Sequence, residues 1–182
     1  ITNTGGSHAN LTDEYAAIPE EMKCVANYFD KEVLVNVSEA EFLENIENVR
    51  YILNDRCVLR AVHFFDENKR VAKEVSALEQ GDVDLFLRHV KDSGDSSYKY
   101  LQNVYSVKDV YHQNVSLALA LSESILGDAG VCRVHGGGFA GTIQAIVKNE
   151  EVKTYQKYMD RVFGDGSCSV MKIRKYGGMQ VV

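Results

Sequence analysis

Residues 131–148 read Val-Cys-Arg-Val-His-Gly-Gly-Gly-Phe-Ala-Gly-Thr-Ile-Gln-Ala-Ile-Val-Lys, and this stretch decides the fold. Its first four residues favour a β-strand, and Ile143, Ala145 and Val147 alternate with their neighbours as in a second, half-buried strand. Three consecutive glycines between the strands cost conformational entropy on folding. We therefore expect them to let the backbone approach a packed neighbour or a ligand closely, or to form an ordinary tight connection between strands.

Two catalytic motifs share letters with this loop, and neither fits its surroundings. Gly136, Gly138 and Gly141 have the spacing of the dinucleotide-binding fingerprint, which requires a helix after the glycines, but a strand pattern follows here. His135 and the glycines also match the oxyanion loop of esterases. That fold requires a Gly-x-Ser-x-Gly elbow, which the chain lacks.

The composition predicts one domain with a substantial core, because the chain has 182 residues. A net charge of −6 with scattered signs argues against a nucleic-acid partner. No apolar run is long enough for a transmembrane helix and no signal peptide is visible, so we expect no membrane association. The four cysteines are far apart and indicate free thiols in a reducing cytoplasm rather than a metal site.

Apolar periodicity predicts a series of helices in the first two thirds of the chain. Pro19 is expected in the first turn of one helix, and Asp55 is expected to cap a long one. Gly81-Asp82 ends the long helix and begins another, and residues 92–97 are expected to form a loop. The Ser106-x-x-Asp109 motif is predicted to open the next helix.

The remainder of the chain predicts a small sheet beneath these helices. Residues 1–4 are typical of the end of a strand, residues 152–162 of an amphipathic helix, and residues 167–174 of a further strand. The tail from Gly177 is expected to be flexible. The fold class is therefore α+β, with helices packed on a small antiparallel sheet.

Charged residues on the long helix have simple structural interpretations. Arg60, Glu67 and Arg70 have the spacing of helix-surface charges. His63 lies near the apolar face and is expected to be a packed structural residue rather than a ligand.

The loop at residues 135–141 resembles the third motif of the GHMP small-molecule kinases, most closely the galactokinases, where Thr-Gly-(Ala/Gly)-Gly-Phe-Gly-Gly leads at once into a strand. Residues 60–67 match the Arg-Ala-x-His-x-x-x-Glu segment of this family, and Gly81-Asp82 followed by Phe86 matches another. His135 stands where the family has Thr, and Ala140 replaces a glycine, which puts the sugar specificity in question.

This resemblance implies that residues 1–182 form a single ferredoxin-like GHMP-kinase C-terminal domain, a fragment of a longer two-domain kinase. The intact protein would phosphorylate galactose or a related sugar to the sugar 1-phosphate with ATP and Mg²⁺, in the cytoplasm. The phosphate loop and catalytic Asp of the family would lie in the missing N-terminal domain. This chain would then hold no catalytic residue and be inactive alone. A non-catalytic sugar sensor or co-inducer that binds sugar and ATP is the alternative, and a stand-alone interaction domain is a remoter one.

The resemblance also implies which residues face the ligands. The loop near the ATP phosphates would comprise His135, Gly136, Gly137, Gly138, Phe139 and Gly141. Tyr15 would contact the sugar, because residues 13–15, Asp-Glu-Tyr, look like the family's Ser-Glu-Tyr segment. The same three residues are also consistent with an ordinary surface turn.

Overall fold

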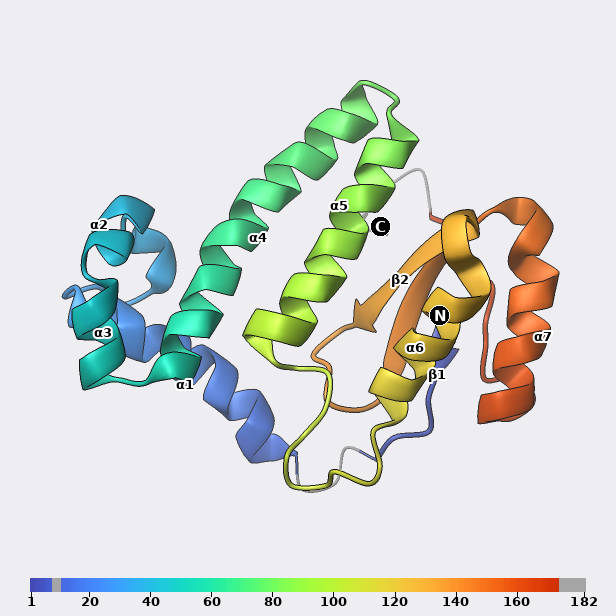
Figure 1. The fold of residues 1–182 in the computed structure, drawn as a ribbon, viewed down its shortest axis with the longest axis horizontal. Helices are drawn as coiled ribbons and strands as arrows, with labels where there is room; N and C mark the ends of the chain where they lie inside the picture. Colours follow the sequence, from blue (N-terminus) through green and yellow to red (C-terminus); the bar gives the residue numbers. More distant parts are fainter. Residues whose placement is uncertain (8–10, 174–182) are drawn as a thin grey trace, which may run out of the picture.

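The computed structural model describes residues 1–7 and 11–173 (Figure 1). The α-helices are α1 (Thr12–Tyr28), α2 (Glu39–Glu44), α3 (Ile46–Ile52), α4 (Asp55–Glu79), α5 (Val83–Ser96), α6 (Asn114–Leu126) and α7 (Val152–Phe163). The strands are β1 (Thr2–Asn3), β2 (Gly130–His135) and β3 (Thr142–Val147). A π-helical turn, η2 (Ser97–Leu101), follows α5 directly, and the 3-10 turns are η1 (Leu34–Asn36), η3 (Gly127–Ala129) and η4 (Asn149–Glu151).

The sheet is antiparallel with strand order β1-β3-β2, and the β2–β3 hairpin pairs Gly130 with Val147 and His135 with Thr142. On the free edge of β1, Asn3 N donates to Ser167 O at 2.9 Å and Ser169 N donates to Ile1 O at 2.8 Å. With this edge segment, the chain follows the β-α-β-β-α-β order of ferredoxin-like domains. The predicted α+β fold, with helices packed on a small antiparallel sheet, is confirmed.

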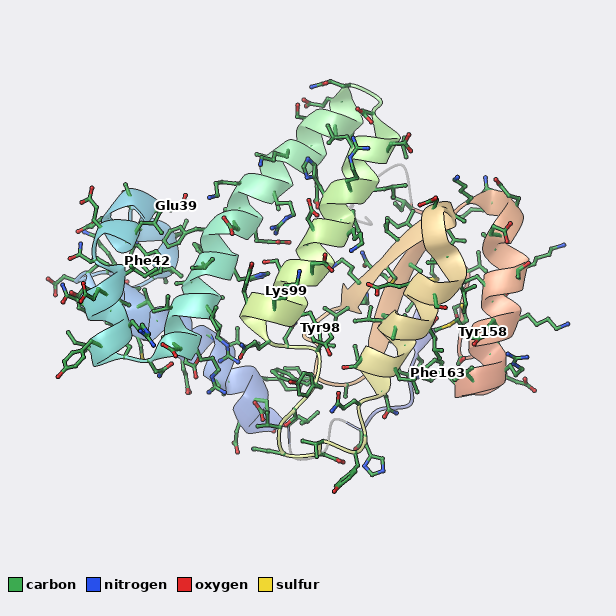
Figure 2. The ribbon with its side chains drawn as sticks, viewed as in Figure 1. Glu39, Phe42, Tyr98, Lys99, Tyr158 and Phe163 are labelled. Atoms are coloured by element: carbon green, nitrogen blue, oxygen red, sulfur yellow. The ribbon has the colours of Figure 1, made fainter. Side chains whose placement is uncertain are left out.

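The helices α6 and α7 build one hydrophobic core together with the sheet. Ile143, Val134 and Met159 are almost fully buried in this core, at 0%, 2% and 0% exposure. Ile143 is the buried residue of β3 and the others are half-buried, and the predicted inward positions Ala145 and Val147 pack against the same core. Figure 2 shows Tyr158 and Phe163 on α7, and both pack against this core.

A second hydrophobic core lies among α1, α2, α3 and α4. Phe42 and Val49 are fully buried there, and the ring centroids of Phe42 and Phe65 are 5.3 Å apart. Figure 2 shows Phe42 in this outer group of helices, on the opposite side of the molecule from α7. Helix α5 joins the two parts, because it packs against α4 on one side and β2 on the other.

Two predicted elements between residues 92 and 113 are wrong. Residues 92–96 continue α5 instead of forming a loop, because Ser93 and Ser96 are buried and bonded to α4 side chains. The predicted cap at Ser106 does not open a helix, because the Ser106 hydroxyl donates to Glu14 at 2.8 Å. The helix begins at Asn114 instead. In both places a long-range contact overrides the local signal.

The predicted boundaries of α1, α4 and the last strand also need correction. Pro19 lies inside α1 and not in its first turn, because the helix already begins at Thr12. Glu14 and Tyr15, in the part of α1 before Pro19, are held by hydrogen bonds to distant segments. Asn54, not Asp55, caps α4, since its side chain accepts from Cys57 N. Of the strand expected at residues 167–174, the described residues 167–173 form only a single bridge, at Cys168. Residue 174 and the tail from Gly177 lie outside the described part of the chain.

The prediction of free thiols is confirmed, because all four cysteines are unpaired and only Cys24 is exposed. Burial raises the pKa of Cys132 to about 12, so this thiol is protonated and unreactive near neutral pH. Within residues 1–7 and 11–173, no helix has the length and apolar character needed to cross a bilayer.

The sheet core predicts a large loss of stability on truncating Ile143. Ile143→Ala should lower the free energy of unfolding of the 182-residue chain by about 2–5 kcal/mol, because the cavity forms in a fully buried site. Urea denaturation followed by circular dichroism measures this change. Ile173→Ala is the matched control, since Ile173 is 96% exposed, and it should change little. Equal effects of the two substitutions would contradict the assigned core.

Candidate functional site

The glycine-rich loop connects β2 to β3 and bends back on itself through left-handed backbone conformations. Gly136, Gly138 and Gly141 have φ angles of +73°, +85° and +86°. Phe139 also has a positive φ, +56°, which is uncommon for a residue with a side chain. His135 is exposed, and its Nδ1 lies 2.8 Å from Gln144 Oε1 on the next strand.

Gly138 is buried against Asn103, in the segment that follows η2. A Cβ atom at Gly138 would lie 1.8 Å from the Asn103 carbonyl oxygen, so only glycine fits this position. The same carbonyl accepts from Phe139 N at 2.5 Å, and Asn103 Nδ2 donates to Gly137 O at 3.2 Å. At this position, the glycine provides close approach to a packed neighbour, one of the three roles that the sequence left open.

Tyr15 lies against the same loop although 123 residues separate it from Gly138. Its hydroxyl donates to Gly138 O at 2.7 Å, and its ring meets the Phe139 ring edge-on with centroids 5.3 Å apart. A Cβ at Gly137 would lie 2.8 Å from Tyr15 Cε1. Burial raises the pKa of Tyr15, so the hydroxyl stays protonated and can donate at neutral pH.

The structure therefore brings together both groups of predicted site residues. The loop residues 135–141 and Tyr15 form one contiguous site. Its far end is fixed by Thr4, whose N and Oγ1 both donate to Gly141 O at 2.8 Å. Gly136 and Gly137 are exposed. Gly138 and Phe139 are buried and form the base of the loop.

A cavity of about 420 Å³ adjoins the loop at Phe139. Its wall combines aromatic, cationic and other side chains from α1, α4 and the segment after α5: Glu14, Arg56, Arg60, Tyr98, Lys99, Gln102, Val104, Tyr105, Val107 and Phe139. Figure 2 shows Tyr98 and Lys99 at the end of α5, between the outer helices and the sheet.

Arg60 corrects one of the sequence interpretations, because it is not a helix-surface charge. It is 1% exposed, and it pairs with Glu21 of α1 at 2.9 Å and donates to Leu101 O at 3.2 Å. Burial lowers the pKa of Arg60, while the Glu21 carboxylate opposes this effect. The buried ion pair ties α1 and α4 to the segment that holds the loop.

Glu67 and Arg70 are likewise largely covered, which contradicts their interpretation as surface charges. They pair with each other, and Glu67 also accepts from Ser93 of α5. Arg133 of β2 donates to Ser93 Oγ at 2.5 Å and so connects this network to the sheet. The network joins α4, α5 and the strand that leads into the loop.

His63 has the structural role that the sequence predicts. It is 7% exposed, and its Nδ1 lies 2.9 Å from Ser96 Oγ. Burial lowers its pKa, so the imidazole is neutral at physiological pH.

No family model matches the chain. A galactokinase of Glaesserella parasuis serovar 5 (strain SH0165) is 29% identical to it over 157 residues, which cover 86% of this chain and 39% of the galactokinase. A galactokinase of Mannheimia succiniciproducens has the same identity and coverage. The crystal structure of Lactococcus lactis galactokinase complexed with galactose matches with a TM-score of 0.66 and 24% identity, over 89% of this chain and 40% of that one.

The chain resembles the galactokinases. The structural match confirms the expected fold of a GHMP-kinase C-terminal domain. The chain spans about two fifths of the length of the galactokinases it matches, so the remaining three fifths of such proteins have no counterpart in it.

Sequence reasoning missed Asn103, although this residue makes the closest contact with the loop of the galactokinase-like domain. Asn103 follows the left-handed residue Gln102 and belongs to no periodic pattern. Its contact with Gly137 spans 34 residues. The sequence contains only an indirect signal: the run of glycines indicates a close backbone neighbour but does not say which residue it is.

Within the described residues, no group of three or more His, Cys, Asp or Glu side chains is arranged to hold a metal ion. A magnesium site is therefore not assigned to any residue of this chain.

The close approach at Gly138 predicts that two neighbouring glycines tolerate alanine differently. Gly136→Ala should cost about 1–2 kcal/mol, because φ is positive but the space around its Cβ is open. Gly138→Ala should cost clearly more, since it adds a clash with the Asn103 backbone. Chemical denaturation of both variants of the 182-residue chain measures the difference, and similar losses would show that the Asn103 contact is not formed.

Proposed function

We propose that the chain is the C-terminal domain of a galactokinase-like sugar kinase, which transfers a phosphoryl group from ATP to galactose or a related sugar. The observation that supports this proposal most is the contact between Tyr15 and the glycine-rich loop. Both were singled out from separate parts of the sequence by their resemblance to galactokinase motifs, and they form one site. The galactokinase similarity over 86% of the chain supports the same activity.

The proposed site assigns a role to each part of the loop. The exposed backbone at Gly136 and Gly137 would approach the phosphate groups of ATP, because glycine leaves the peptide N–H groups uncovered. The Tyr15 hydroxyl donates to Gly138 O, and its oxygen lone pairs would accept from a sugar hydroxyl. Mg²⁺, when bound with ATP, would neutralise the phosphate charge. The groups that hold it and the catalytic carboxylate would belong to an N-terminal domain.

This division of labour predicts activity only in the longer protein. The protein that contains this domain should phosphorylate galactose with ATP at a turnover of about 1–100 s⁻¹, the usual range of kinases. A coupled assay of ADP release measures it. The 182-residue chain alone is the control and should show no turnover, because it lacks the proposed phosphate loop and catalytic Asp.

The same assay separates the kinase from its alternative. A galactokinase-like sensor would bind sugar and ATP in a calorimeter yet release no ADP beyond the rate without sugar. If the folded, full-length protein gave this result, we would conclude that it is a sugar-binding protein and not a kinase. Phosphorylation by the isolated 182-residue chain would contradict the proposed location of the catalytic residues.

Tyr15 provides a test of the sugar contact. Tyr15→Ala in the longer protein should raise KM for the sugar about fivefold, the effect of losing about 1 kcal/mol, and should raise KM for ATP less. Steady-state kinetics with each substrate varied in turn measure both constants. Tyr15→Phe is the matched variant, since it keeps the ring against Phe139 and removes only the hydroxyl. An effect confined to ATP would rule out the proposed sugar contact.

A further inference from the structure

Asn103 occupies a fixed position beneath the glycine-rich loop. Gln102, with φ of +58°, ends η2 and turns the chain toward the loop. The turn is held at Leu101, whose carbonyl accepts from the buried Arg60, and at Gln102, whose N donates to Ser97 O at 2.8 Å. Asn103 itself is 4% exposed. The residue is therefore presented by a hydrogen-bonded turn at the end of η2.

The two contacts of Asn103 lie on either side of Gly138. The backbone carbonyl of Asn103 accepts from Phe139 N, and its side-chain Nδ2 donates to Gly137 O at 3.2 Å. In a trans peptide the C=O and N–H groups point in opposite directions. By holding Gly137 O, the Asn103 side chain therefore fixes the direction of the Gly138 N–H.

Tyr15 controls the next peptide in the same way. Its hydroxyl holds Gly138 O at 2.7 Å, while the opposite N–H of this peptide, that of Phe139, points to Asn103 O. The orientations of two successive peptide groups are thus fixed by hydrogen bonds. Without these bonds, the glycines at 137 and 138 would allow many backbone conformations. The Asn103 side chain is the group that sets the first of the two orientations.

We propose that Asn103 is a positioning residue that fixes the peptide between Gly137 and Gly138 in the orientation required for phosphoryl transfer. This inference rests on the proposed kinase function of the loop. Asn103 acts through the loop backbone and does not itself contact the reacting atoms. Its side chain therefore affects how well the loop is preorganised rather than which sugar is bound.

The structure suggests a sharp pair of substitutions. Asn103 Oδ1 has no hydrogen-bond partner among the described residues, so Asn103→Asp breaks no hydrogen bond on that side, although it adds a negative charge. It replaces the donor that faces Gly137 O by an oxygen, which repels the carbonyl. Asn103→Ala removes the donor without this repulsion. Both variants keep the backbone bond from Phe139 N.

The first measurement is the amide ¹H–¹⁵N spectrum of the 182-residue chain, which contains its own hydrophobic cores. The Gly137, Gly138 and Phe139 resonances should move in Asn103→Asp and in Asn103→Ala, and more in the former. Asn45→Ala is the matched control, because Asn45 also donates to a backbone carbonyl, that of Glu41, but lies among the outer helices. Should Asn103→Asp fail to fold, Asn103→Ala alone decides. Unmoved loop resonances in Asn103→Ala would overturn the inference.

The second measurement is the kinetics of the longer protein. Asn103→Ala should lower kcat about tenfold and leave KM for the sugar within about twofold, in contrast to Tyr15→Ala. Displaced loop resonances with unchanged kcat would overturn the role of Asn103 in the reaction. Failure of the proposed function is seen separately, because the unsubstituted longer protein would then show no turnover at all.

Discussion

The close approach of the Gly138 backbone to the Asn103 carbonyl is the constraint on which the site depends. A side chain at residue 138 would collide with the main chain of Asn103, and the preceding residue but one, Leu101, is held by a hydrogen bond from the buried Arg60. The loop, the end of η2 and Tyr15 of α1 therefore share one arrangement. Glycine contributes here less through flexibility than through the absence of a Cβ atom.

Buried and half-buried charges connect this arrangement to the rest of the molecule. Glu21 and Arg60 join α1 to α4, and Glu67 with Arg133 joins α4 through α5 to β2. Burying such groups costs desolvation energy, which only good geometry and further hydrogen bonds offset. The Glu21–Arg60 pair holds α1 against α4, and the Glu67–Arg133 pair holds α4 against the hairpin that carries the loop.

The chain order explains how distant segments reach the loop. The helices α1 to α5 are inserted between β1 and the helix α6 that covers the sheet, and α1 to α4 build a hydrophobic core of their own. The first turn of α1 and the segment after α5 both contact the loop. The inserted helices thereby supply Tyr15 at one end and Asn103 at the other. A minimal ferredoxin-like unit without these helices would lack both contacts with the loop.

The sequence by itself determined the α+β class, the β2–β3 hairpin and the extent of α7, because periodicity and glycine runs are local signals. Tyr15 and the loop became a candidate site only through their resemblance to galactokinase motifs. Only the tertiary structure decided that residues 92–96 are helical, that Arg60 is buried, and that Asn103 packs beneath Gly138. Each of these depends on a partner tens of residues away. A serine, an arginine or an asparagine has no strong intrinsic preference at these positions, so its long-range hydrogen bonds decide its conformation and burial.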